Sequence, residues 1–463
     1  MPGSRRLDRA ALAAVLVAVA VLVSLHVRDH PALSHIDELQ HMDYTLKSPF
    51  HVPRHGDAIG QAAMEEAACR GIDYPLRLGI DALGDWLHLT GERGVETLNP
   101  GSVPRAQLPL CGSLLLAPEQ FPNSGLNTAS PHPPVYYTAT ALGAAVIEAA
   151  PGVDSPVSGA RLMGIFWLGA AAVVLWYALG GLGASLWSKT LLIGLLAVSP
   201  RVLHASSIIN PDTTALLGGA LVLAAAVRWD AGRAPGWLLP LASLAAVWLK
   251  FTNSVAVGAA AVYLAVRAWQ HRDSLTRQHL RRLAAVAGTA VVLTAASIFI
   301  WSAAQDARGH IPAEQLPTNA IYEVDDFQWD RLGDELFAAL TPLRDPFVPD
   351  TLPRNLLAPL GDLINLLVLV GLGAVGLFAL KGSSHRALAA AAVVAMAATG
   401  LVTMVTSYLT LGIYFDTNPR YGLSLLPFAA AALVPVIENR WIRGAAAAVA
   451  AVTTAAVLAG ATT

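Results

Sequence analysis

Two adjacent acids follow shortly after the first apolar segment of the chain. Asp37 and Glu38 lie in the stretch SHIDELQHMDY, and His41 comes four residues after Asp37, so a helix would place Asp37 and His41 on one face. Adjacent carboxylates suit general-base work or metal binding, because one can hold a cation or orient its neighbour while the other accepts a proton. The alternative is a solvated polar cap on a helix beside a membrane. We take Asp37 and Glu38 as the candidate catalytic acids.

A third acid lies in the turn SSIINPDTTALLGG. Pro211 and Asp212 have the types expected at the start of a helix, so ordinary capping and complementarity to the helix dipole are one explanation for Asp212. The other explanation is that Asp212 binds a ligand. If this turn and Asp37 reach the same membrane surface, Asp37 and Asp212 would share a divalent cation such as Mg, Mn, Ca or Zn.

Basic residues accompany these turns on the side of the membrane where positive charge is usually sparse. Arg201 and His204 precede the NPD turn, Lys250 lies in WLKFTN, and Arg420 lies in NPRYGLSLLP. Long basic side chains near helix ends often extend to the interface, which is the alternative. An anionic ligand explains them better, and we predict that Lys250, Arg420 and Arg201 bind a phosphate.

The stretch PHPPVYY combines stiff prolines with His132, Tyr136 and Tyr137. Prolines at a helix start and tyrosines at a membrane surface are typical of an interfacial anchor. The same rigid imidazole and phenol groups also suit the binding of a polar acceptor molecule at that surface.

Composition shows which kind of protein must position these residues. Of the 463 residues, 55% are hydrophobic and 13% charged, whereas a soluble domain has roughly 25% charged residues. The sequence therefore predicts an all-α polytopic membrane protein. It contains no P-loop, dinucleotide fingerprint or zinc signature, so no nucleotide cofactor is expected. The net charge of −2 gives no indication of a nucleic-acid partner.

Charge asymmetry predicts the topology. Apolar runs give twelve candidate spans, and the four most basic connectors are residues 228–233, 267–282, 381–386 and 440–443. The positive-inside rule requires all four connectors to be cytoplasmic. This is possible under two conditions. Residues 237–266 must form two short helices broken at KFTN, and one other apolar run must not cross the membrane. The weakest run is 135–150, which is short and opens with PHPPVYY. We therefore predict about eleven transmembrane helices, a cytoplasmic N-terminus, and a re-entrant or juxtamembrane segment at 135–150.

This topology divides the chain into five parts. They are a first transmembrane helix (1–27), a first extracytoplasmic loop with juxtamembrane helices and the catalytic acids (28–134), a core transmembrane module (135–302), a second extracytoplasmic loop (303–355) and C-terminal transmembrane helices (356–463). Loops this long in a helical protein are usually functional.

Both cysteines, Cys69 and Cys111, fall in the first predicted loop. An extracytoplasmic location makes a disulfide between them plausible, with a contribution of about 3 to 5 kcal/mol to stability. Two free thiols are the alternative, since the sequence gives no Cα separation.

The order of these motifs resembles the GT-C superfamily of lipid-linked sugar transferases. The shared features are the acidic pair beyond the first helix, HPP-YY after a large loop, an ARL helix entry and an NPD turn. The nearest similarity is to a bacterial branch with a DE..H motif, here Asp37, Glu38 and His41. Protein O-mannosyltransferases and the aminoarabinose transferase are more distant. The first 250 residues carry most of the resemblance.

The resemblance implies an inverting glycosyltransferase in the bacterial plasma membrane. It would move a sugar from a polyprenyl-phosphate donor to an envelope glycan, lipid or protein acceptor on the extracytoplasmic face. Asp37 matches the family's catalytic or metal-proximal acid, Glu38 its partner, and Asp212 the second acid. The residues expected to bind the donor or acceptor sugar are His41, His132, Tyr136, Tyr137, His204 and Asn210.

Two alternatives remain. One is a transporter or flippase of a lipid-linked or polar envelope precursor, although transporters usually carry ionisable residues at mid-membrane and show repeated halves. The other is a polymerase or ligase of lipid-linked glycans, which would use the same donor chemistry.

Overall fold

The computed structural model describes residues 2–34, 37–73, 117–153, 155–274, 276–320, 322–343 and 357–460. These residues are mostly helical, and the strands among them, β1 (Leu33–Ser34) and β2 (Ile72–Asp73), form one short parallel pair. The predicted all-α class is therefore confirmed. The α-helices are α1 (Pro2–Asp29), α2 (Glu38–Lys47), α3 (Gln61–Arg70), α5 (Val135–Glu148), α6 (Pro156–Leu162), α7 (Gly164–Gly181), α8 (Leu186–Val198), α9 (Pro200–Ala205), α10 (Ala215–Asp230), α11 (Leu238–Leu249), α12 (Ser254–Gln270), α13 (Arg277–Arg308), α14 (Pro317–Ala320), α15 (Leu332–Ala338), α16 (Leu357–Phe378), α17 (Ser384–Leu411), α18 (Leu426–Ile437) and α19 (Arg440–Gly460).

Eight helices in the described part of the chain are long and apolar enough to cross a membrane. The protein is thus a multi-pass membrane protein by the length and composition of its helices. Two shorter apolar helices, α8 and α11, accompany them, whereas α5 is not in either group. The eight candidate spans are Arg6–Asp29, Pro156–Gly181, Phe251–Gln270, Arg277–Arg308, Pro359–Phe378, Ser384–Leu409, Pro419–Ile437 and Arg440–Ala459.

The helices pack closely around α10, which contacts α7, α11, α12 and α18. A glycine allows a further close contact of α10. A Cβ atom at Gly219 would overlap the backbone carbonyl of Ser424 in the 3₁₀ segment η10 (Pro419–Leu425), so α10 and η10 can lie together only because Gly219 has no side chain. This contact holds the segment that carries Arg420 against the core.

The connectors between consecutive helices meet at one end of the bundle, which we call the basic end. Arg267 at the end of α12 donates to Asp230 at the end of α10 (2.9 Å) and to the carbonyl of Gly382 between α16 and α17 (2.5 Å). The backbone N–H of Ser185, between α7 and α8, donates to Glu438, between α18 and α19 (2.9 Å). Polar contacts therefore join three of these connectors in one group and two in another.

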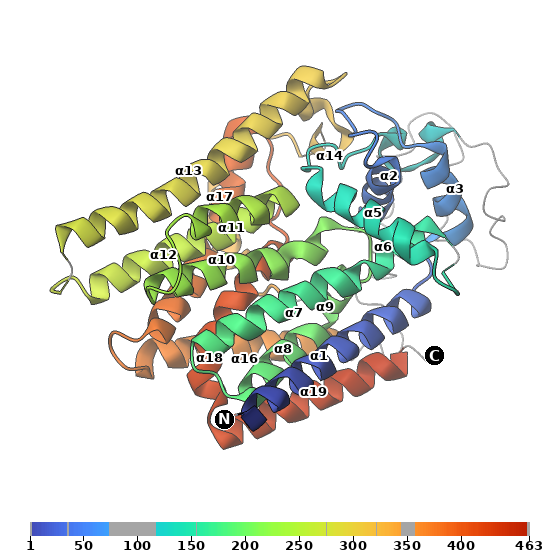
Figure 1. Ribbon diagram of the computed structural model, residues 1–463. Coiled ribbons are helices and arrows are strands. Elements are labelled where there is room, and N and C mark those ends of the chain that lie inside the picture. The colour runs from blue at the N-terminus through green and yellow to red at the C-terminus, as the bar shows by residue number, and fades with distance from the viewer. Residues whose placement is uncertain are drawn as a thin grey trace.

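The long polar segments lie at the opposite end, which we call the loop end. Figure 1 shows α2, α3 and α14 gathered there, together with the last turns of α13. It also shows α1 and α19 side by side and running in the same direction, so that the C-terminal end of α19 lies on the side where α1 ends.

Local structure differs from the sequence-based boundaries in three places. The first helix continues to Asp29. The apolar run at residues 191–209, one of the twelve candidate spans, is divided into α8 and α9 at Pro200, because proline has no N–H for the preceding helix. The helix predicted to end at 302 extends to Arg308, since no proline or glycine interrupts the chain before Gly309. The break at KFTN is as predicted: η6 (Phe251–Asn253) separates α11 from α12.

Candidate active site at the loop end

Four short segments bring the predicted charged residues together. Asp37 precedes α2 with a left-handed backbone (φ 56°, ψ 11°), which Asp tolerates better than most residues. Asp212 lies in η5 (Pro211–Thr214), whose N-cap Asn210 accepts from the Asp212 N–H (2.9 Å). Lys250 ends α11 in an extended conformation, and Arg420 lies in η10.

These residues form a linear array of alternating charge. The Lys250 ammonium bonds to Asp212 Oδ1, Arg420 Nε lies 3.3 Å from Asp212 Oδ2, and Arg420 Nη2 lies 3.3 Å from Asp37 Oδ2. Exposure rises along it, from 4% for Lys250 and 6% for Asp212 to 13% for Arg420 and 49% for Asp37. We call this the charged array; its Lys250 end is buried and its Asp37 end is open.

Arg201 adds a third cation at the buried end. It lies in α9 and is 2% exposed, and its Nη2 is 3.3 Å from the side-chain oxygen of Asn418. The same Asn418 oxygen accepts from the backbone N–H of Arg420 (3.1 Å). With Arg201, Lys250 and Arg420 against Asp37 and Asp212, the formal balance is three positive and two negative charges, so the site carries an excess of one positive charge.

The cations keep Asp212 ionised. Burial alone would raise the pKa of this carboxyl, but the Lys250 ammonium and the Arg420 guanidinium outweigh burial and hold the pKa well below its usual range. Burial lowers the pKa of Lys250, and Asp212 opposes that shift. The pair is therefore a charged ion pair in a site with little water around it.

Glu38 is adjacent in sequence to Asp37 but has a different environment. Its two oxygens accept from Arg161 Nε and Nη2 (2.7 Å each), and also from the backbone N–H groups of Ser34 (2.6 Å) and Ile209 (2.9 Å). Glu38 is fully buried and Arg161 is 2% exposed. Each oxygen accepts two hydrogen bonds, which leaves Glu38 without a lone pair for a substrate hydroxyl.

Arg161 links Glu38 to the end of α1. Its Nη1 donates to the carbonyl of His30 and its Nη2 to the carbonyl of Ala32, each at 2.7 Å. Glu38 in turn reaches Ile209, just before η5. This buried pair therefore fixes the relative positions of α1, α2 and the turn that carries Asp212.

Imidazole and phenol groups border the charged array. His41 Nδ1 lies 2.7 Å from the Tyr137 hydroxyl, and the His41 ring lies 5.2 Å from the ring of His132. The Tyr137 ring stacks on Tyr44 with the centroids 3.7 Å apart. Burial, aided by Lys250, lowers the pKa of His132 to about 3, and burial lowers that of His41 well below its usual range. Both imidazoles are therefore neutral at pH 7.

The remaining predicted ligand-binding residues lie around this core in different ways. Tyr136 is buried against Tyr137 (5.1 Å between centroids). His204 Nε2 lies 3.3 Å from Ser34 Oγ, toward the end of α1. Asn210 caps η5, as noted above. Tyr136 is near enough to Asp212 for the two to interact electrostatically. The sugar-binding roles of Tyr136 and His204 stay predictions.

The turn that carries His132 is fastened to the end of α13. Gln305 Nε2 donates to the carbonyl of Ser130 (2.5 Å), and Trp301 Nε1 donates to the carbonyl of Pro131 (2.9 Å). Arg308 donates to the carbonyl of Val52 in the first loop. These contacts join both ends of the loop region to α13 and set the position of His132.

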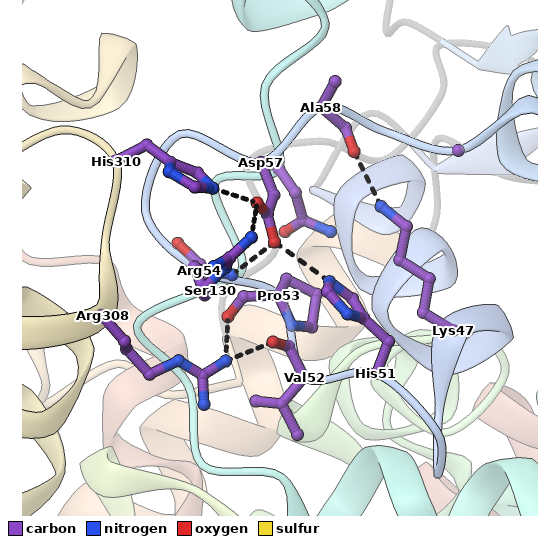
Figure 2. Close-up of polar contacts among 12 residues, drawn as sticks. Lys47, His51, Val52, Pro53, Arg54, Asp57, Ala58, Ser130, Arg308 and His310 are labelled. Carbon is purple, nitrogen blue, oxygen red and sulfur yellow. Dashed lines mark hydrogen bonds and ion pairs between the residues drawn. The ribbon is translucent and has the colours of Figure 1, made fainter.

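An exposed cluster lies beside this attachment. Figure 2 shows His51, Arg54 and His310 converging on Asp57. His51 Nε2 lies 3.0 Å from Asp57 Oδ2 and His310 Nε2 lies 3.2 Å from Asp57 Oδ1, and both histidines are about half exposed. We call these four residues the Asp57 cluster; it joins the first loop to the segment after α13.

In the structure a guanidinium stands where the shared divalent cation was predicted. Arg420 lies between Asp37 and Asp212 and is paired with both, so a cation placed between the carboxylates would meet a guanidinium. Among the described residues no group of three or more His, Cys, Asp or Glu side chains is arranged to hold a metal ion. A divalent cation shared by Asp37 and Asp212 therefore stays a prediction.

The predicted disulfide is only partly within view. Cys69 lies near the end of α3, while Cys111 lies outside the described residues. The pairing stays a prediction.

Sequence reasoning did not assign roles to three residues. Arg161 had a detectable signal, since it is a lone arginine within an apolar helix start. Tyr421 follows Arg420 and places its ring 5.6 Å from Lys250 Nζ. Tyr322, in the second loop, is near enough to Asp37 for the two to interact electrostatically; nothing in its sequence context indicates this.

No protein-family model, curated protein sequence or solved structure matches this chain. The assignment of function therefore depends on the geometry of the charged array.

Proposed function

We propose that the protein is a membrane glycosyltransferase of the GT-C type that uses a polyprenyl-phosphate sugar as donor. One observation carries this proposal: the charged array has a buried cationic end and an open carboxylate, Asp37, at the loop end of a membrane helix bundle. A phosphate suits the first and an acceptor hydroxyl suits the second. Because basic connectors mark the opposite end, we place the loop end outside the cytoplasm.

The donor phosphate would lie among Arg201, Lys250 and Arg420. Arginine forks bind phosphate oxygens in pairs, and lysine adds a point charge. The excess positive charge of the site favours a bound anion. Burial of Arg201 and Lys250 strengthens each interaction, since little water competes for them.

An apolar cavity lies within the helix bundle. It has a volume of about 110 Å³ and lies between α8, α16, α18 and α19, with Leu196 and Leu426 in its lining. Leu196 is five residues before Arg201 and Leu426 six residues after Arg420. The apolar lining of the cavity suits part of the hydrocarbon chain of a polyprenyl phosphate.

The proposed reaction is one inverting displacement. The acceptor oxygen attacks the anomeric carbon of the sugar as its proton passes to the Asp37 carboxylate, and the bond from that carbon to the phosphate oxygen breaks. The polyprenyl phosphate leaves as an anion that Arg420, Lys250 and Arg201 stabilise. Glu38 does not take part directly; it holds the turn before η5 through the Ile209 N–H and the end of α1 through Arg161.

Donor photolabelling tests the proposal. The purified chain in lipid nanodiscs is irradiated with a polyprenyl-phosphate analogue that carries a photoreactive group, and the labelled fraction is measured. Arg420→Gln should reduce labelling at least tenfold, because it removes one of the three cations proposed to hold the donor phosphate. Arg272→Gln, a matched change of an exposed arginine at the basic end, should label like the wild type.

Two results would contradict the proposal. One is equal labelling of the Arg420→Gln and wild-type chains. The other is labelled peptides that come from the basic end of the bundle. Net movement of an intact lipid-linked precursor across the bilayer, without release of polyprenyl phosphate, would favour a transporter instead.

A further inference from the structure

The open end of the charged array continues into the second loop. Glu323 and Ile413 form an antiparallel bridge, in which Tyr414 N donates to the Tyr322 carbonyl (2.8 Å) and Val324 N donates to the Gly412 carbonyl (3.0 Å). This bridge fixes Tyr322 beside the turn that leads to Arg420. It brings an aromatic side chain from a distant segment to the neighbourhood of Asp37.

The side chains at this place combine aromatic rings with carboxylates. Tyr322 is 43% exposed, and its ring lies 6.0 Å from that of Phe415. Asp416 is exposed and accepts from the Tyr414 hydroxyl (2.7 Å). Burial raises the pKa of Tyr322, and Asp37 and Asp416 raise it further. The Tyr322 hydroxyl therefore lies within electrostatic reach of both carboxylates and keeps its proton.

This combination has the chemistry of a saccharide subsite. A sugar ring has an apolar face that packs on an aromatic ring and an edge of hydroxyls that bond to carboxylates and phenols. We propose that Tyr322, Phe415 and Asp416 bind a sugar ring of the acceptor and direct one of its hydroxyls to Asp37. The inference rests on the proposed function and narrows it, since it makes the acceptor a glycan and excludes a peptide or a lipid.

The order of residues assigns this subsite to the acceptor. From Lys250 to Asp37 the array becomes steadily more exposed, and Tyr322 lies within electrostatic reach of Asp37, its most exposed member, and of Asp416. A lipid-linked donor approaches from the membrane and is held by the buried cations. A water-soluble glycan approaches from the loops, where the aromatic rings and the acids are.

Saccharide binding can be measured without turnover. The chain in nanodiscs is mixed with neutral oligosaccharides released by partial acid hydrolysis of the envelope, and binding is followed by saturation-transfer NMR. Tyr322→Ala should lower the transferred signal at least fivefold, whereas Tyr322→Phe, which keeps the ring, should retain most of it. Trp329→Ala is the matched control, since Trp329 is an exposed aromatic residue of the same loop.

Each outcome separates this inference from the proposed function. Loss with Tyr322→Ala and retention with Tyr322→Phe support the subsite. An undiminished signal in Tyr322→Ala, or no signal in the wild type, overturns it even if donor photolabelling succeeds. Failure of donor photolabelling instead overturns the proposed function, whatever the saccharides do.

Discussion

Asp37 and Glu38 are neighbours in the chain, yet they lie in opposite environments. Glu38 is fully buried, and its oxygens accept four hydrogen bonds, two of them from Arg161. Asp37 is 49% exposed and meets Arg420 at 3.3 Å. The same chemical group thus stabilises the fold at one position and stays available to a ligand at the next.

The difference arises from the backbone conformation at Asp37. Asp37 has a left-handed backbone immediately before α2 and its side chain meets Arg420, while Glu38 begins the helix and faces Arg161 of α6. A buried carboxylate whose lone pairs all accept hydrogen bonds stabilises the fold and fixes the positions of the segments that it joins. An exposed carboxylate beside a cation remains free to accept a proton. The role of Glu38 is therefore tested by stability, and the role of Asp37 by activity.

Breaking the buried pair should have the largest effect. Arg161→Ala leaves the Glu38 carboxylate buried without its cation, which typically costs about 3 to 5 kcal/mol. We expect the variant to give little monodisperse protein in detergent, as measured by size-exclusion chromatography. Replacing both residues, in Glu38→Met with Arg161→Met, should recover much of the yield. A normal yield from Arg161→Ala alone would show that this pair does not hold the fold.

Changing the exposed acid should affect activity and leave stability intact. Asp37→Asn keeps the shape and removes the proton acceptor, so we expect sugar transfer to fall at least 100-fold, about the lower end for general-base catalysis. Transfer from a radiolabelled donor is measured beside the thermal unfolding midpoint. The midpoint should change little because Asp37 is half exposed. Retained transfer would remove Asp37 from the mechanism.

Acid should weaken the fold through the buried imidazole His132. An unfolded histidine binds a proton near pH 6.5, whereas His132 in the fold does so near pH 3, because burial and Lys250 disfavour its charged form. Between these values the unfolded chain binds more protons, so stability falls as the pH drops from 6.5, by at most about 1.4 kcal/mol per pH unit.

The measurement is the unfolding midpoint from pH 7 to pH 4. His132→Gln should flatten this dependence in part, since His41 contributes in the same direction. His271→Gln, a change of an exposed histidine at the basic end, is the matched control. An equally steep profile in His132→Gln would contradict the assignment.

The smallest effect should come from the Asp57 cluster. His310 is about half exposed and lies 3.2 Å from Asp57, and such exposed pairs contribute about 0 to 1 kcal/mol. We expect His310→Ala to change the free energy of unfolding by less than about 1 kcal/mol, measured by denaturant titration. A loss as large as that of Arg161→Ala would remove the distinction between exposed and buried pairs.

The sequence was sufficient for the fold class and for part of the site. Long apolar runs show the membrane helices directly, and the break at KFTN and the basic connectors appear at the expected places. Asp37, Asp212, Lys250 and Arg420 were all predicted from charge that is unusual beside a membrane, and the structure brings them together.

Partnerships between distant segments could not be predicted. Residue types do not reveal that Glu38 pairs with Arg161, 123 positions away, whereas Asp37 meets Arg420, 383 positions away. In the sequence pair DE, Asp37 and Glu38 look equivalent. The separation of their roles depends on one backbone conformation and on helix packing, which the local pattern does not encode.

The most direct test of the central claim is the position of the donor phosphate. A cryo-EM structure of the chain in nanodiscs with a non-hydrolysable polyprenyl phosphonate would locate it. We expect the phosphonate within hydrogen-bond distance of Arg420 and Arg201, with the open carboxylate of Asp37 on the side of the sugar. Density for the phosphonate at the basic end, or away from all three cations of the site, would contradict the account.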